Sequence, residues 1–405
     1  MLKKSMLILF LLLLGKISLY IYYSSLDQCY GYDFEFTSTD DREPTISEII
    51  KGAGNCLNEQ RAIYTKPEIN GALIKRVYDV KLPRFIESLS TYIYSFYVSY
   101  TMPKKLQAGI ILYDYNFNKN FASDKQKIEH IRRSSLINIY MKNSKTGSKY
   151  RILINPFIVS DCVPFNVPIS YCRGQDLVSI DNNYTNDEKS SSISDQYSHY
   201  INVYKKLGLS SSLGPAVDFY ASQFEEQKDL NNFTSKISKT MEKSSFIPVI
   251  KHFTYDGSIG DSHLTFSIND LSWKDFESQL KPYRKVEELS FPYMIMTTHQ
   301  AIGTLDKKMS ATQSYPVYSF IRKNFPNAIV LADSISMKGM KGHNFYEKLI
   351  TGKADLYIIH LGLHTPWLKL INSKKGFNEM RHSDKSIERI LQLKKHYGLL
   401  KITKI

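Results

Sequence analysis

The sequence predicts an α/β fold, a (β/α)8 barrel of the TIM type, and three observations lead to that prediction. Short apolar runs recur along the chain with amphipathic helical patterns between them. The runs are nearly continuous, which is typical of parallel strands covered on both faces. Seven or eight such units fit within residues 81–405, a suitable length for one closed barrel with insertions. An open, doubly wound sheet is the alternative, but no Gly-x-Gly-x-x-Gly turn indicates a dinucleotide site.

The apolar runs expected to be strands follow one another in a regular order. They are Ala108–Tyr113, Tyr150–Ile154, Leu213–Phe219, Phe246–Phe253, Tyr293–Thr298, Ala328–Ala332 and Leu356–Leu361. The helical patterns are Phe85–Tyr97, Asp195–Leu207, Tyr315–Asn324 and Ser386–Tyr397. The polar segments 116–149 and 181–195 interrupt this order, and we expect both to be surface insertions.

Residues 1–25 have the pattern of a signal peptide or a membrane anchor. Lys3 and Lys4 precede an apolar stretch over residues 6–23 that only Lys16 interrupts. A charged start before a short apolar core is typical of export signals, and the whole stretch is about long enough to span a bilayer. We therefore expect an exported protein, periplasmic or extracellular, with residues 6–23 either removed or kept as an anchor in the inner membrane.

Composition and cysteines narrow the class of protein further. The chain is 42% hydrophobic and has a net charge of +14, but no nucleic-acid motif accompanies its lysines, so we expect no nucleic-acid partner. Four cysteines allow three pairings, of which the local ones, Cys29–Cys56 and Cys162–Cys172, are expected. No Cys-x-x-Cys motif or His cluster has the spacing typical of metal ligands, so we expect neither a metal nor a cofactor. We also expect a monomer. Residues 26–80 are polar and weakly periodic, and we expect them to form an extension before the barrel domain.

Ionisable residues follow several of the expected strands, where the active site of a barrel lies. Asp218 ends one run, His299 follows another, and Asp333 follows a third. Lys251 and His252 end a fourth run. Each alone is weak evidence, because an aspartate at a strand end often caps a helix and a histidine often satisfies a core hydrogen bond. Their combined order indicates an active site.

The stretch IPVIKHFTYDGSIGDSHLTFS, residues 247–267, resembles the Lys-His-Phe…Asp-Ser-His signature of family 3 glycoside hydrolases. The most similar branch is that of the bacterial β-N-acetylhexosaminidases that act on peptidoglycan fragments. Four other segments resemble family strands in the same order. They are LQAGIILYDYNFN (106–118), KKLGLSSSLGPAVDF (205–219), YMIMTTHQAI (293–302) and FPNAIVLADSISMKGM (325–340). The resemblance covers residues 80 to 370 in round numbers.

The resemblance implies a role for each residue that matches a family motif. Asp333 matches the nucleophile that attacks the anomeric carbon. His263 matches the acid/base that protonates the leaving oxygen, and Asp261 matches the carboxylate that orients it. Lys251 and His252 match groups that bind sugar hydroxyls.

Departures from the family pattern concern the groups that hold the substrate. Asn155 takes the place of the aspartate in the family's Asp-x-Glu-Gly-Gly turn, and no arginine occurs in residues 220–233. Asp218, His299 and Tyr255 are further candidates for substrate contact. For Asp218 the alternative is strand-end capping, and for His299 it is a structural hydrogen bond.

These observations predict a retaining glycosidase of the β-N-acetylhexosaminidase type. Its expected substrate is a β-linked N-acetylglucosamine-type residue in cell-wall or related glycans. One alternative is a catalytically weakened barrel that binds a glycan or a protein partner, which the altered substrate-holding groups favour. Another is a phosphorylase, because a histidine acid/base does not repel phosphate as a carboxylate would.

Overall fold

The structure is a computed structural model, and the description below is restricted to part of the chain. The described residues are 33–57, 62–65, 107–112, 136–160, 204–220, 227–254, 265–335, 337, 339–340, 354–360 and 384–405, with parts of 125–133 and 198–202. The N-terminal segment 6–23 and the segment 181–195 lie outside them, as do Phe85–Tyr97 and the side chains of all four cysteines. In the described part, no helix combines the length and the apolar character needed to cross a membrane.

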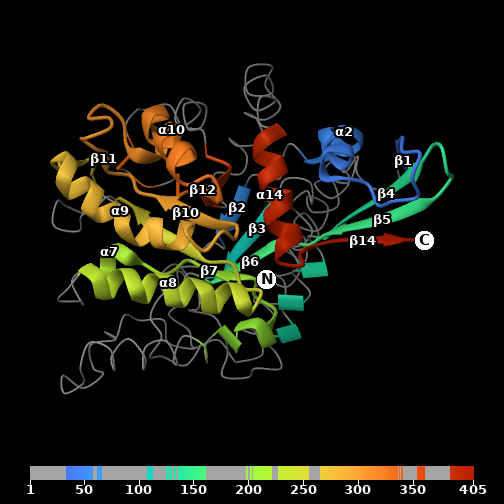
Figure 1. Cartoon of the computed structure of the whole chain (residues 1–405), viewed down its shortest axis with the longest axis horizontal. Helices are drawn as coiled ribbons and strands as arrows, with labels where there is room; N and C mark the ends of the chain where they lie inside the picture. The colour runs from blue at the N-terminus through green and yellow to red at the C-terminus, as the bar shows by residue number, and fades with distance from the viewer. Residues whose placement is uncertain are drawn as a thin grey trace, which may run out of the picture.

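An eight-stranded parallel sheet forms the centre of the described structure (Figure 1). In sheet order its strands are β7 (Ser211–Ser212), β6 (Phe157–Ser160), β3 (Gln107–Leu112), β2 (Ala62–Thr65), β13 (Leu356–His360), β12 (Ala328–Ala332), β10 (Tyr293–Thr297) and β8 (Val249–Phe253). Backbone hydrogen bonds also join the chain around β7 to that of β8, although these strands stand at opposite ends of the order. Ile247 donates to Ser210, Val249 to Gly214 and Lys251 to Pro215.

Strands β10 and β12 of this sheet are buried on both faces, as their unbroken apolar runs indicate. Along β10 and β12, residues alternate between two core clusters: Ile295 and Val330 lie in one, Met296 and Leu331 in the other. The first cluster lies under helices α9 (Trp273–Glu287) and α10 (Tyr315–Asn324). Helix α8 (Gln227–Lys243) packs beside α9 in the same outer layer (Figure 1). A side chain on the second face of the sheet therefore points away from these helices.

A second, four-stranded sheet lies to one side of the first (Figure 1). In sheet order it contains β1 (Asp33–Phe36), β4 (Ile137–Asn143), β5 (Lys149–Ile154) and β14 (Leu400–Lys404). Helices α2 (Ile46–Leu57) and α14 (Asp384–His396) pack on the small sheet. Their buried residues belong to the second core cluster, together with the second face of the large sheet. The shared cluster joins the two sheets into one hydrophobic core.

Several expectations about the elements are confirmed, and others are wrong. Strand β12 and helix α10 have the expected bounds, and β3, β8, β10, β13 and α14 agree to within a few residues. The run Tyr150–Ile154 is a strand, but it belongs to the small sheet. Its alternation of buried and exposed residues is typical of an antiparallel sheet with one solvent-exposed face. In the segment Leu213–Phe219, residues from Val217 onward form the short helix α7 (Val217–Tyr220).

Two expected boundaries also change. Strand β2 lies inside the large sheet, between β13 and β3, so the sheet begins within residues 26–80 and not after an extension. Strand β4 lies within residues 116–149, which we expected to be a surface insertion. The partners of β2 are remote in sequence, so no local turn signal identifies that strand. Strand β4 instead forms an antiparallel hairpin with β5 and also pairs with β1. Within the expected helix Asp195–Leu207, residues 198, 201–202 and 204–207 are helical.

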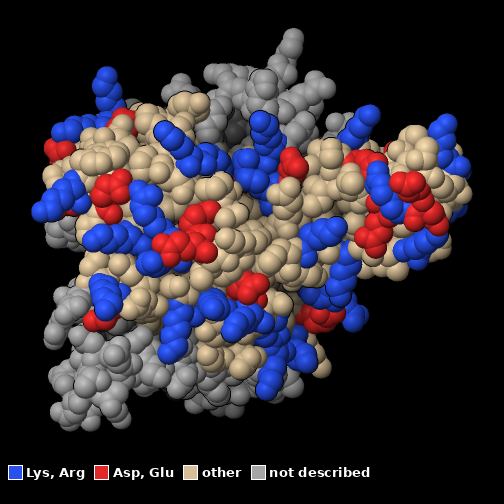
Figure 2. Space-filling model, viewed as in Figure 1, with Lys and Arg blue, Asp and Glu red and all other residues tan. Residues whose placement is uncertain are grey.

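Charged side chains are spread over the visible face of the molecule. In Figure 2, Lys and Arg lie over the helices and the small sheet with Asp and Glu among them. On α9 the pairs Arg284–Glu277 and Lys285–Glu288 have N–O distances of 2.7 and 2.8 Å. Exposed pairs of this kind contribute about 0–1 kcal/mol each to stability. On this face the net positive charge is therefore distributed over several elements.

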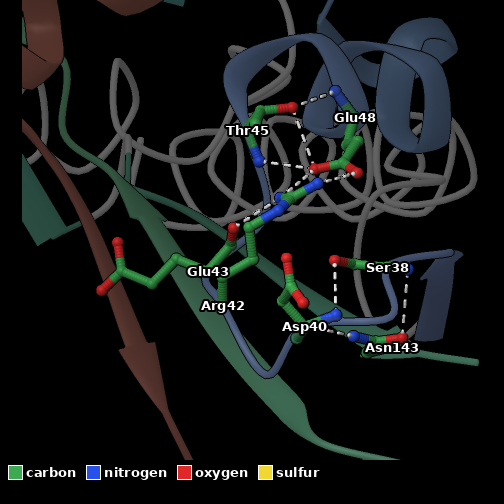
Figure 3. A network of polar contacts seen from close by, with 7 residues as sticks. All are labelled: Ser38, Asp40, Arg42, Glu43, Thr45, Glu48 and Asn143. Atoms are coloured by element: carbon green, nitrogen blue, oxygen red, sulfur yellow. Dashed lines mark hydrogen bonds and ion pairs between the residues drawn. The ribbon is translucent and has the colours of Figure 1, made fainter. Parts of the chain in front are cut away.

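The start of helix α2 is held by a capping box (Figure 3). The Glu48 carboxylate accepts a hydrogen bond from Thr45 N at 2.7 Å, and the Thr45 hydroxyl accepts one from Glu48 N at 3.2 Å. Arg42 donates to both oxygens of the same carboxylate, at 2.8 and 2.9 Å. These hydrogen bonds from Arg42 lower the pKa of Glu48 to about 2.

Replacing Glu48 with alanine is expected to lower the free energy of unfolding by about 1 kcal/mol, because a cap and a bidentate pair are lost together. Glu48 is ionised in the folded protein at a pH where the unfolded chain binds a proton. Its contribution is therefore complete above about pH 4.3 and is lost as the pH falls toward 2. Urea unfolding followed by circular dichroism at pH 7 and pH 3 measures both effects. Glu43→Ala, next to the network, is the matched control, and an equal loss in it would contradict the prediction.

Candidate active site

The candidate site lies at the carboxyl end of the parallel sheet, where β8 carries an irregularity. Two steps along β10, from Ile295 to Thr297, correspond to three along β8, from Ile250 to Phe253. Ile250 and Phe253 are three residues apart, yet both pack in the first core cluster, under α9 and α10. In a regular strand, side chains return to the same face every second residue. Because of this extra residue, the side chain of His252 does not follow the regular alternation between the two faces of the sheet. The Lys251–His252 peptide bond is cis.

His252 lies between two carboxylates that come from different elements. Its Nδ1 is 2.8 Å from Oδ2 of Asp218, in the first turn of α7. Its Nε2 is 3.8 Å from Oδ2 of Asp333, the residue that follows β12. The first contact is a hydrogen bond that the imidazole donates, and the second is an ionic contact beyond hydrogen-bond range. The side chain of His252 is 26% exposed and those of both aspartates are 9% exposed.

The two carboxylates favour a protonated imidazole. Burial alone would lower the pKa of His252, but the charge and hydrogen bond of Asp218 and the charge of Asp333 together raise it above its ordinary value. Lys251, which is 8% exposed, acts in the opposite direction and is the weakest of these influences. The site therefore combines two acids, an imidazole with a raised pKa and a buried ammonium group.

The backbone around Asp333 is held by specific hydrogen bonds. Ser334 N donates to Oδ1 of Asp333 at 2.6 Å, which leaves Oδ2 toward His252. The Ser334 carbonyl accepts from Nε2 of His299 at 2.8 Å and from Met337 N at 3.1 Å. A carbonyl only accepts, so Nε2 of His299 carries the hydrogen in this bond. By the alternation of β12, Asp333 follows Ala332 onto the face opposite α9 and α10.

The structure brings four of the expected site residues together, with an altered role for one of them. His252, Asp218 and Asp333 are in direct contact, and Lys251 is adjacent to His252. Asp218 orients His252. From the sequence we expected Asp218 to contact the substrate or to cap a strand end, and this role is neither of the two. His299 is fully buried and anchors the backbone after Asp333, which agrees with the structural alternative. Within the described part of the chain, no three His, Cys, Asp or Glu side chains gather as a metal site would require.

The structure does not bring Asn155 to the site, which corrects its expected contact with the substrate. Asn155 precedes β6 and therefore lies toward the amino ends of the parallel strands, opposite the edge that carries His252 and Asp333. Its Oδ1 accepts from Nη1 of Arg132 at 2.7 Å, and its Nδ2 donates to the Leu399 carbonyl at 3.2 Å. The second bond connects the end of β5 to the chain that leads into β14.

The strand of the large sheet in this region is β6, and the residue after it in sequence is Asp161. The signal for this strand was the short run Phe157–Ser160 followed by an acid, but the longer apolar run Tyr150–Ile154 hid it. Asp161 itself lies outside the described residues. So do Asp261, His263 and Tyr255.

Comparisons with known proteins agree with this architecture. No model of a known protein family matches the sequence, and a search of curated proteins found no match. Among solved structures, the chain is similar to a family 3 glycoside hydrolase β-N-acetylglucosaminidase from Paenibacillus sp. at 14% identity and a TM-score of 0.52. That match covers 72% of this chain and 57% of the Paenibacillus chain, so this chain spans little more than half of that protein.

Two further structures match over more of this chain. The β-N-acetylglucosaminidase from Thermotoga maritima is 14% identical with a TM-score of 0.57, covering 84% of this chain and 67% of that one. LpqI of M. tuberculosis is 13% identical with a TM-score of 0.56, covering 87% of this chain and 97% of that one. The chain thus has the fold of family 3 glycoside hydrolases, and the resemblance that the sequence motifs indicated is confirmed at the level of the fold.

Proposed function

We propose that this protein is a retaining β-glycosidase built on a closed (β/α)8 barrel, with Asp333 as its nucleophile. Backbone hydrogen bonds between the chain around β7 and that of β8, at opposite ends of the strand order, support the closed barrel. The observation that carries the proposed activity is the position of Asp333 at the carboxyl end of β12 beside His252. Catalytic groups of barrel enzymes lie at this edge of the sheet.

The proposed reaction has two steps. Asp333 Oδ2 forms a bond to the anomeric carbon while the glycosidic bond breaks and its oxygen takes a proton. His263 is the proposed donor of that proton, with Asp261 as its partner. Water then attacks the glycosyl ester, His263 accepts a proton from it, and the Asp333 carboxylate is released. In both steps the nucleophile and the group that carries the proton are side chains of this protein.

The proposed substrate is a β-linked N-acetylglucosamine-type residue of a cell-wall or related glycan. Support comes from the fold shared with β-N-acetylglucosaminidases and from the Asp-Ser-His segment at 261–263. Lys251 and His252 are proposed to bind sugar hydroxyls. Because β6 is the strand of the barrel, we place Asp161, and not Asn155, as the acid that binds the distal hydroxyls. Export of the protein and anchoring by residues 6–23 remain part of the proposal.

The test is the release of nitrophenol from aryl β-glycosides of N-acetylglucosamine, glucose, galactose and xylose, with Asp333→Asn beside the wild type. We expect turnover of the N-acetylglucosaminide that is absent in the variant. Proton NMR of the first product is expected to show the β-anomer, which retention requires. A wild type as inert as the variant on every sugar would overturn the proposal and favour a barrel that only binds a glycan or a protein partner. Turnover only in the presence of phosphate, with a sugar phosphate as product, would identify a phosphorylase.

A further inference from the structure

The carboxylate of Asp218 is connected to that of Asp333 through one side chain, His252. Its Oδ2 is 2.8 Å from Nδ1 of His252, and Nε2 of the same ring is 3.8 Å from Asp333 Oδ2. The parallel bridge between Ala216 and Lys251 sets the chain that leads into α7 against the end of β8. The acid is therefore placed by backbone pairing, and the ring is turned toward Asp333 by that acid.

The described titratable and charged groups around His252 come from four elements: Asp218 on α7, Asp333 after β12, Lys251 on β8, and Tyr283 on α9 near Asp218. Burial raises the pKa of Tyr283 well above its ordinary value, so this phenol stays neutral. The carboxylates of Asp218 and Asp333 face the two nitrogens of one ring, and both favour its protonated form against the effects of burial and Lys251.

We propose that Asp218 is a positioning residue that holds the imidazole of His252 in place, so that Nε2 of the ring faces the carboxylate of Asp333. This inference rests on the proposed role of Asp333 as nucleophile. When the glycosyl ester forms, Asp333 loses its charge, and when water cleaves the ester the carboxylate leaves with the bonding electron pair. The imidazolium of His252 stabilises that charge as it appears, which favours release of the sugar.

The critical variant is Asp218→Asn, which keeps the shape of the side chain and an oxygen that can accept from Nδ1 but removes the charge. Asp229→Asn is the matched control, because Asp229 is also an acid in the first turn of a helix, α8. The titration midpoint of His252 is measured by NMR in each folded protein and in Asp333→Asn. The ¹⁵N shifts of His252 are assigned by their absence in His252→Gln.

In Asp218→Asn we expect the midpoint of His252 to fall by about one pH unit, with no change in the control. Asp333→Asn should also lower the midpoint of His252. In the hydrolysis assay, kcat of Asp218→Asn should fall about tenfold or more at neutral pH. A merely structural role of Asp218 would not move the His252 midpoint.

An unchanged midpoint of His252 in Asp218→Asn would overturn the inference, as would an unchanged midpoint of His252 in Asp333→Asn. The NMR measurement requires no turnover. If the wild type hydrolyses no glycoside but the His252 midpoint falls in Asp218→Asn and in Asp333→Asn, the proposed glycosidase activity is contradicted and the positioning role of Asp218 stands. If the wild type hydrolyses glycosides but the His252 midpoint falls in neither variant, the reverse holds.

Discussion

Replacing Asp333 with alanine is expected to lower hydrolysis of an aryl β-N-acetylglucosaminide by about four orders of magnitude or more, because the change removes the proposed nucleophile from the proposed two-step displacement. Asp333 is 6% exposed and is held by the Ser334 amide on one oxygen. No neighbouring described carboxylate replaces it, because Asp218 lies on the far side of the His252 ring.

Azide distinguishes loss of the nucleophile from loss of the fold. A small anion in the space left by the Asp333 side chain can attack the anomeric carbon of a substrate with a good leaving group. We expect azide to restore turnover of a dinitrophenyl glycoside by Asp333→Ala and to yield the α-glycosyl azide. Asp275→Ala, which alters an acid at the start of α9, is the control and should keep wild-type activity without any effect of azide. Activity of Asp333→Ala within tenfold of the wild type would contradict the assignment of the nucleophile.

Replacing Asp355 with alanine is expected to lower the free energy of unfolding by about 3–5 kcal/mol, the usual cost of removing one partner from a buried ionic group. The Asp355 side chain is fully buried and precedes β13. Arg389 donates from Nη2 at 2.7 Å, Val330 N donates at 2.8 Å, and Arg322 forms a third, short contact. The carboxylate thus ties α10, α14 and β12 together, and its loss leaves two arginines without their common partner.

The same group predicts a dependence of stability on pH. Burial alone would raise the pKa of Asp355, but Arg322 and Arg389 lower it below its ordinary value. A carboxylate with a lowered pKa stabilises the folded state fully above the ordinary value, near pH 4, and its contribution is lost as the pH falls through the folded value. Urea unfolding of the wild type and Asp355→Ala should therefore differ most at pH 7 and least at acidic pH.

The control for Asp355 is Asp270→Ala, which breaks an exposed pair with Lys307. Both residues of that pair are 59% exposed, so the variant should cost no more than about 1 kcal/mol. Equal losses in the two variants would show that the buried carboxylate has no special contribution.

Much of the parallel sheet follows from local sequence patterns. Strand β12 and helix α10 are predicted with their observed bounds because an unbroken apolar run and a 3.6-residue periodicity are properties of consecutive residues. The position of Asp333 follows as well. A residue directly after a buried parallel strand lies at the edge of the sheet where the other strands also end.

The small sheet shows where such patterns are insufficient. Strand β14 pairs with β5, and Lys404 contacts Asp41, 363 positions away in the chain. Local periodicity identifies Tyr150–Ile154 as a strand but does not say which sheet it joins. That choice assigned Asn155 to the site and overlooked β6 with the acid after it.

The sequence by itself predicted the class of the fold and the carboxyl edge where the site lies, because these depend on periodicity and on the residues that end each strand. The resemblance to family 3 glycoside hydrolases added the expected role of Asp333 as nucleophile. Only the tertiary structure decided the partner of His252. Asp218 is 34 positions away and became its partner through the pairing of Ala216 with Lys251 and the irregularity of β8. Contacts between side chains of different strands depend on register and on one extra residue in a strand. Neither is encoded in the residues that make the contact, and both arise only when the whole sheet assembles.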